Sequence, residues 1–165
     1  MKVSVRVLFM SAMLLASVSG ASATSYLQAS SSEEQLATDP KPKVVTMNSV
    51  DAKKNVTVDK SIIRVNENGA FFFVAAAQVG GKAKGLVRMW MRINGKDVDN
   101  SNTEQIITDP EFTAVLVCQG VAEVKRGDKV EVVFSGSVPG IGLVVKKPAG
   151  EPVVPSIILS GWRID

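Results

Sequence analysis

Histidine is absent from this sequence, and its absence removes several kinds of active site at once. Histidine is the usual general base and the commonest transition-metal ligand in proteins. A Ser-His-Asp hydrolase and a cupin-like metal site would both lack their central residue. We therefore expect no catalytic site of these types, and no metal or other cofactor.

Cysteine is nearly absent too, because Cys118 is the only one in the chain. A single cysteine cannot form a disulfide within the chain, so the fold must be held by its hydrophobic core. Cys118 lies between Val117 and Gln119 in an apolar stretch. That position is typical of a buried, unreactive thiol and argues against a catalytic nucleophile.

A strong net charge is also lacking. Of the 19 Lys and Arg residues, Lys2 and Arg6 lie in a segment that we expect to be removed, which leaves 17 against 16 Asp and Glu residues. A chain so close to neutral gives no reason to expect a nucleic-acid partner or adhesion to an acidic membrane surface.

The N-terminus has the pattern of an export signal. Lys2 and Arg6 are followed by apolar residues over positions 7–18, and Ala21 and Ala23 have the spacing that signal peptidase recognises. The apolar run is shorter than the about 20 residues that a membrane span needs. The pattern predicts a signal peptide over residues 1–23 and a secreted or periplasmic protein, with no stable membrane insertion after cleavage before Thr24.

Residues 24–43 differ in composition from the rest of the chain. They are rich in Ser, Glu, Gln and Thr, and Pro40 and Pro42 near their end disfavour a regular strand or helix. The composition predicts a flexible lead over residues 24–43, followed by a folded domain over residues 44–165.

From Val44 onwards, short stretches rich in Val, Ile and Phe are separated by turn signals such as Asn94-Gly95 and Gly127-Asp128. No stretch has the apolar period of a helix, so the pattern predicts an all-β domain, either a sandwich or a closed barrel. The expected strands cover residues 44–50, 61–65, 70–79, 85–93, 104–108, 112–124, 129–135, 142–145 and 155–164.

Some of these strands are apolar on both faces. In a strand over residues 71–74, Phe71 and Phe73 point to one side while Phe72 and Val74 point to the other. One side fills the domain's own core, and the other needs cover from loops or from a second subunit. Curvature of a single monomer is the alternative source of cover. We favour self-association.

Three motifs occur in a fixed order between Ile63 and Val132. They are Gly-x-aromatic-x-aromatic at residues 69–73, a strand that enters an Asn-Gly turn at residues 87–95 with its continuation at 98–101, and an apolar-x-x-Gly-Asp-x-Val-x-Val hairpin at residues 124–132. Together they resemble the jelly-roll superfamily of complement globular heads and tumour-necrosis-factor-like proteins, in particular its bacterial-type members.

The resemblance implies an all-β, two-sheet antiparallel jelly-roll sandwich that assembles as a homotrimer. It places Phe71 and Phe73 at the subunit interface near the three-fold axis, and Phe72 inside the monomer's own sandwich. Residues 155–165 lack the Phe-x-Gly pattern that ends animal members. This departure argues against transferring a receptor-type role from those relatives.

Two further features are candidate ligand sites. Arg88, Trp90 and Arg92 alternate along one strand face and are candidate ligand contacts, although a packed Trp beside solvated arginines is the simpler interpretation. Residues 97–102 offer oxygen atoms that suit calcium. Asp and Asn also favour turns, and we favour the turn.

Carboxylates alone could hydrolyse glycosides, but nothing in the sequence pairs any two of them. The candidates are Asp97, Asp99, Asp109, Glu111, Glu123, Asp128 and Glu131. The leading hypothesis is therefore an exported, non-catalytic interaction module, a homotrimer that binds an unknown protein or glycan. A structural component of a surface or matrix is the alternative, and a carboxylate-only hydrolase ranks last.

Overall fold

The computed structural model describes residues 25–165, so the expected signal peptide over residues 1–23 lies outside the described residues. The described part is built from strands without a helix, and it thus holds no helix that could span a membrane. The strands are β1 (Tyr26–Ser31), β2 (Gln35–Leu36), β3 (Lys43–Val44), β4 (Ser49–Lys54), β5 (Val56–Asp59), β6 (Ile62–Val65), β7 (Gly69–Gly81), β8 (Gly85–Ile93), β9 (Lys96–Asp97), β10 (Thr103–Ile107), β11 (Ala114–Val124), β12 (Lys129–Gly136), β13 (Ile141–Leu143) and β14 (Ile157–Arg163).

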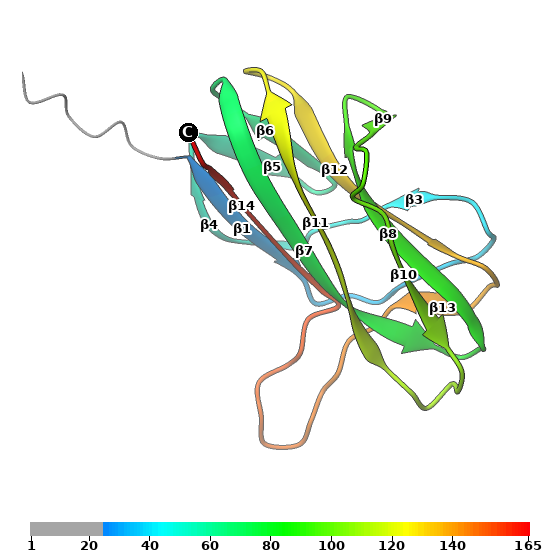
Figure 1. The fold of residues 1–165 in the computed structure, drawn as a ribbon. Helices are drawn as coiled ribbons and strands as arrows, with labels where there is room; N and C mark the ends of the chain where they lie inside the picture. Colours follow the sequence, from blue (N-terminus) through cyan, green and yellow to red (C-terminus); the bar gives the residue numbers. More distant parts are fainter. Residues whose placement is uncertain (1–24) are drawn as a thin grey trace, which may run out of the picture.

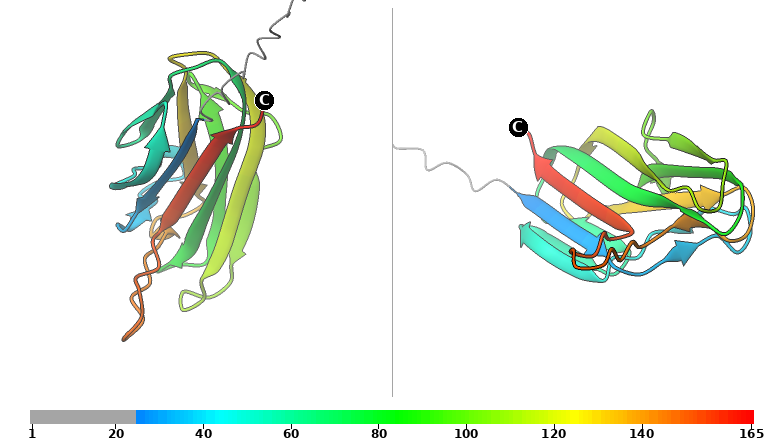
Figure 2. Two further views of the ribbon diagram at one scale, coloured as in Figure 1. Left: turned by 90° about the vertical axis from the view of Figure 1, so that its left-hand side faces the viewer. Right: turned by 90° about the horizontal axis from the view of Figure 1, so that it is seen from below.

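The strands form two antiparallel sheets that pack face to face (Figures 1 and 2). In sheet A the strand order is β4-β1-β14-β7-β11, and β13, which carries β2, pairs with β7 beyond the end of β14. In sheet B the order is β5-β6-β12-β8-β10, with β3 paired to β12 and β9 to β8. The predicted two-sheet antiparallel jelly-roll sandwich is confirmed.

Turn chemistry sets the main strand boundaries. Asn94 and Gly95 have φ angles of 51° and 80° between β8 and β9, and Gly127 has a φ of 91° between β11 and β12. Asn and Gly tolerate these left-handed values, so the predicted turns and the long strands beside them are confirmed. The strand expected over residues 44–50 is wrong, because the chain crosses from sheet B to sheet A there and splits into β3 and β4.

The flexible lead predicted over residues 24–43 is also wrong for the residues that are described. Tyr26–Ser31 forms β1, which lies inside sheet A between β14 and β4. Figure 2 shows β1 and β14 side by side. Leu27 and Ala29 point into the core, while Ser31 is buried and its backbone carbonyl accepts hydrogen bonds from Ser156. Gln28 and Ser30 are the polar residues of this strand that face outward.

The core lies between the two sheets and centres on two aromatic rings. Phe71 and Phe73 stack with ring centroids 5.8 Å apart and an angle of 14° between the ring planes. Gly120 and Gly161 are the register partners of Phe73 on the two neighbouring strands. A Cβ on Gly161 would lie 2.5 Å from the Phe73 ring, so the position of this ring requires glycine in β14.

Candidate self-association surface

The outer face of sheet A, which points away from sheet B, is largely apolar. In β7, Phe72 and Val74 face outward because Phe71 and Phe73 face the core. The same alternation acts in β1, β11 and β14. We call this surface the outer apolar face, and its members are Tyr26, Phe72, Val74, Ala76, Val115, Val117, Val121, Ile158 and Trp162.

A row of large side chains, which we call the aromatic row, crosses this face at the end where β1 begins and β14 ends. Strand register places Val121, Phe72, Trp162 and Tyr26 next to one another on β11, β7, β14 and β1. The rings of Phe72 and Trp162 are in contact, with centroids 4.9 Å apart and planes inclined by 52°. Even so, Trp162 remains 41% exposed and Tyr26 43% exposed. Large apolar side chains in a contiguous, half-exposed row are typical of an interaction surface.

The row continues towards the other end of the sheet as an aliphatic surface. Register places Val117, Ala76 and Ile158 side by side on β11, β7 and β14. A hollow of about 190 Å³ opens beside them, and residues on β7, β11, β14 and the segment before β14 line it. Val154 and Pro155 form one wall of this hollow, where the 144–156 loop leaves the body of the domain (Figure 1).

The faces predicted for Phe71, Phe72 and Phe73 are wrong, because Phe71 and Phe73 lie in the core of the single chain and Phe72 lies on the opposite face. Phe71 and Phe73 are 0% and 1% exposed within a single chain, so they cannot contact a second subunit. Phe72 instead lies on the outer apolar face. The side chains of β7 do alternate as predicted, but alternation shows only that neighbouring residues face opposite sides of the strand. Which side is the core depends on pairing with distant strands.

Arg88, Trp90 and Arg92 do share the outer face of sheet B, as predicted, but their polar groups are already engaged. Arg88 forms an ion pair with Glu104 at 2.6 Å, and Arg92 forms one with Asp97 at 2.8 Å. The Trp90 indole N–H donates to the same Asp97 oxygen at 2.8 Å. Because Trp90 is only 9% exposed, its ring offers little surface for a stacked ligand.

In the loop over residues 97–102, the Asp97 carboxylate accepts hydrogen bonds from Trp90 and Arg92 on β8, and the Ser101 side chain bonds within the turn. The hydrogen bond from Trp90 holds the pKa of Asp97 below its usual value. The Ser101 hydroxyl donates to the carbonyl of Val98 at 2.7 Å, and Asn100 has a left-handed φ of 59°. Within residues 25–165, no group of three or more acidic, Cys or His side chains is placed to hold a metal ion.

Cys118 is fully buried on the inner face of β11, as predicted. Burial raises the pKa of its thiol to about 12. A thiol with this pKa is almost entirely protonated at neutral pH, which removes its nucleophilic character.

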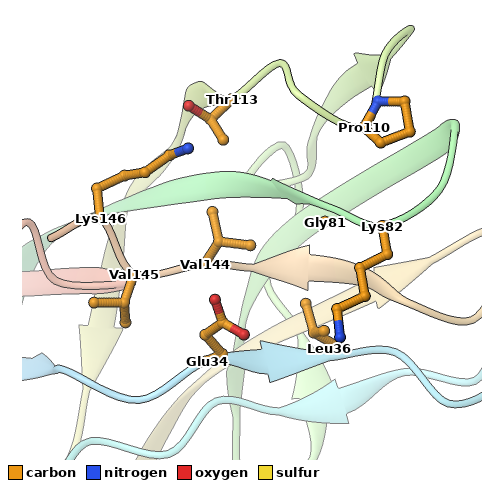
Figure 3. A pocket seen from close by; sticks show the side chains of 9 residues that line it. All are labelled: Glu34, Leu36, Gly81, Lys82, Pro110, Thr113, Val144, Val145 and Lys146. Atoms are coloured by element: carbon orange, nitrogen blue, oxygen red, sulfur yellow. The ribbon is translucent and has the colours of Figure 1, made fainter.

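A second hollow lies at one end of the sandwich, between β2, the end of β7 and the segment before β11 (Figure 3). Its volume is about 170 Å³, and it is lined by Glu34, Leu36, Gly81, Lys82, Pro110, Thr113, Val144, Val145 and Lys146. Ligand pockets commonly enclose about 300–1,000 Å³. We assign no function to this smaller, open hollow.

Comparison with known proteins identifies the fold and no more. No protein-family model matches the chain, and no curated protein matches it. Among solved structures, murine APRIL at pH 5.0 matches with a TM-score of 0.62 and 11% sequence identity, over 86% of this chain and 100% of that chain. The globular domain of zebrafish complement 1qA protein matches with a TM-score of 0.54 and 15% identity, over 87% and 98% of the two chains.

These matches place the described chain in a class by its fold. It is a jelly roll of the type shared by tumour-necrosis-factor-like proteins and complement globular heads. At such low identity, the similarity carries no information about ligand or assembly, which must be argued from this chain's own surface.

Sequence reasoning did not find the aromatic members of the outer apolar face. Tyr26 lies in the segment predicted to be flexible, although Tyr26-Leu27-Gln28-Ala29 already alternates as a strand does. Trp162 lies in a stretch correctly expected as a strand, but its face was not assigned. The missing information is the register between β1, β14 and β7.

Proposed function

We propose that this protein is an exported, non-catalytic interaction module that self-associates as a homotrimer through the outer apolar face and binds a protein or glycan ligand. Membership of the tumour-necrosis-factor-like and complement-head superfamily, in its bacterial-type branch, belongs to this proposal. The number of subunits is what the resemblance in the sequence implies, and the exposed aromatic row on sheet A supports this choice of interface.

The aromatic row on the outer apolar face is the observation that carries the proposal. Full burial of one large apolar side chain contributes about 1.5–3 kcal/mol. Tyr26, Trp162 and Val121 each leave about half of their surface exposed on one contiguous face. Covering this face with neighbouring copies therefore gives a favourable free energy of association, once the entropic cost of association is met.

Two of the candidate carboxylates, Asp97 and Asp128, lack the property that a general acid needs. A general acid in glycoside hydrolysis needs a raised pKa. The pKa values of Asp97 and Asp128 are both lowered, by the Trp90 indole in the first case and by the backbone N–H of Lys125 in the second. These two carboxylates stabilise turns.

Static light scattering of the mature protein and two variants tests the interface. Trp162→Glu places a charge in the middle of the aromatic row, so burying it against another copy is strongly unfavourable. We expect this variant to have the mass of a single chain, whereas the wild type has about three times that mass. Far-ultraviolet circular dichroism should stay unchanged, because Trp162 points away from the core.

Ile106→Glu is the matched control. Ile106 is 56% exposed on the outer face of sheet B, so it is an equally exposed apolar residue outside the proposed interface. Its mass should equal that of the wild type. Loss of assembly in both variants, or in neither, would count against the outer apolar face as the interface.

N-terminal sequencing of the exported protein tests the export part separately. We expect the mature chain to begin at Thr24 because of the Ala-x-Ala pattern before it. An uncleaved protein recovered from membranes as the main product would contradict this part of the proposal.

A further inference from the structure

The edge of sheet A at β4 is open to a further strand. β4 pairs with β1 on one side only and is the last strand of the sheet. All six of its residues are exposed. A β-bulge at Asp51 interrupts the pairing of β4 with β1, and on either side of the bulge the free edge presents backbone N–H and C=O groups that another extended chain can pair with. The opposite margin of the sandwich differs, because β10 and β11 pack against each other there.

A groove lies directly beneath this edge, between β4 of sheet A and β5 of sheet B. Its volume is about 550 Å³, within the size range of ligand sites. We call it the β4 groove, and its lining residues are Glu33, Thr46, Met47, Asn48, Ser49, Val50, Val58 and Lys60.

The inner side of the β4 groove belongs to the apolar layer between the two sheets, but sheet B does not cover it. Val50 is the register partner of Ala29, which is fully buried, so Val50 faces the inside of the sandwich. Val50 nevertheless remains 41% exposed, because sheet B does not reach over it. Met47 is buried at the bottom, and Val58 faces the groove from β5. One apolar side chain from outside would complete this layer.

Two lysines lie near the two ends of this apolar section. Lys53 pairs in register with the buried Leu27 and so faces inward, three residues beyond Val50 on β4. Lys60 lines the groove near its other end, where its carbonyl accepts a hydrogen bond from the N–H of Met47. Neither lysine forms an ion pair within residues 25–165. Together with Glu33, which also lines the groove, the two lysines give the site a net charge of +1 (two Lys minus one Glu), and this charge favours acidic groups in a partner.

We propose that the β4 edge and groove bind an extended, acidic segment of a partner protein, which adds to sheet A as a further strand. In this mode the backbone supplies hydrogen bonds and alternate side chains enter pockets. The central side chain is apolar and enters the groove beside Val50 and Val58, and the side chains two residues away on either side are acidic, near Lys53 and Lys60.

The free backbone edge favours a peptide over a small molecule, because only an extended chain pairs with a row of N–H and C=O groups. Charge also disfavours a second copy of β4. That strand would add Lys53 and Lys54 but only one carboxylate, Asp51, which already accepts hydrogen bonds from Gln28, Ser30 and Ser49. The inference deepens the proposed function by naming the chemistry of the ligand, and its site is separate from the outer apolar face.

The test uses the acetylated and amidated peptide Thr-Asp-Thr-Ile-Thr-Asp-Thr, which presents Asp, Ile and Asp on one face when extended. Binding to the mature protein is measured by fluorescence anisotropy and mapped by amide chemical shifts and hydrogen exchange. We expect shifts confined to residues 46–54 and 58–60, and slower exchange of the β4 amides that do not pair with β1. Methylating the peptide's backbone nitrogens, or replacing Asp by Lys, should weaken binding by about tenfold or more.

Val50→Ser and Ala52→Ser form a matched pair of neutral variants on β4. Ala52 pairs with Gln28 and faces outward, whereas Val50 faces the groove. Val50→Ser should weaken binding by about tenfold, and Ala52→Ser by less than about twofold. Absence of binding at about 1 mM peptide, equal binding of the methylated peptide, or shifts elsewhere on the surface would overturn the proposal.

Light scattering on the same samples separates this inference from self-association. A trimer that fails to bind the peptide overturns the β4 site and leaves the outer apolar face intact as the interface. A monomeric protein that binds the peptide at β4 overturns the outer apolar face as an interface and leaves the β4 site intact.

Discussion

Replacing Phe73 with alanine should destabilise the domain far more than replacing Phe72, although the two residues are neighbours in β7. Phe73 is 1% exposed and packs between Phe71 and the glycine-lined space at Gly161. Loss of such a fully buried phenylalanine costs about 3–5 kcal/mol in the free energy of unfolding. For a domain of this size, each kcal/mol lowers Tm by roughly 2–4 °C.

Phe72 lies on the outer apolar face and contacts Trp162 at a centroid distance of 4.9 Å. Within one chain it is only partly buried, so Phe72→Ala should cost roughly 1–2 kcal/mol by its buried apolar area. Its larger effect should fall on assembly. An assembling protein has a Tm that rises with protein concentration, and Phe72→Ala should weaken that dependence.

Thermal unfolding followed by circular dichroism, over a range of protein concentrations, distinguishes the two effects. Phe73→Ala should show a large drop in Tm with the concentration dependence retained. If Phe72→Ala proves the more destabilising change, or if Phe73→Ala abolishes assembly while leaving the stability of the single chain unchanged, the assignment of the two faces of β7 is refuted.

Three further outcomes are expected. In denaturant titrations, Gly161→Ala should lower the free energy of unfolding by about 1–3 kcal/mol, because the new Cβ meets the Phe73 ring. Gly120→Ala should change this free energy by less than about 0.5 kcal/mol, because its Cβ would meet nothing nearer than 3.9 Å. Cys118 should react with a thiol reagent only as fast as the domain opens, since burial raises its pKa to about 12; rapid labelling of the native protein would disagree. The folded-state pKa of Asp97 is lowered, so the stabilisation from its carboxylate is present above the unfolded value of about 3.9 and is lost as pH falls through the folded value. In urea titrations, the stability advantage of wild type over Asp97→Asn should be present at about pH 6 and should shrink as the pH falls below the unfolded value.

Local sequence signals were sufficient for the strands that are apolar and bounded by turn residues. β8 and β12 begin and end within a residue or two of their expected positions, because Asn94-Gly95 and Gly127-Asp128 mark the turns beside them. The all-β class followed from the strand pattern, and the jelly roll from the resemblance that the ordered motifs carry to a known superfamily. Strand ends and turns depend on residues that are neighbours in the sequence, so the sequence alone was enough to predict them.

Features that depend on pairing between distant residues were not predictable in the same way. β1 lies in a stretch of polar composition over residues 24–43, and its place inside sheet A depends on pairing with β14 and β4, which are distant in the sequence. The position of the Phe73 ring depends on Gly161, which is distant in sequence and adjacent only in register. The β4 groove likewise exists because two edge strands from different sheets leave Val50 uncovered.

Sedimentation equilibrium of the mature wild-type protein over a dilution series tests the central claim most directly. The proposal predicts about three times the monomer mass at micromolar concentration, with dissociation to single chains on dilution or on introduction of Trp162→Glu. A wild-type protein that remains a single chain at high micromolar concentration would contradict self-association through the outer apolar face.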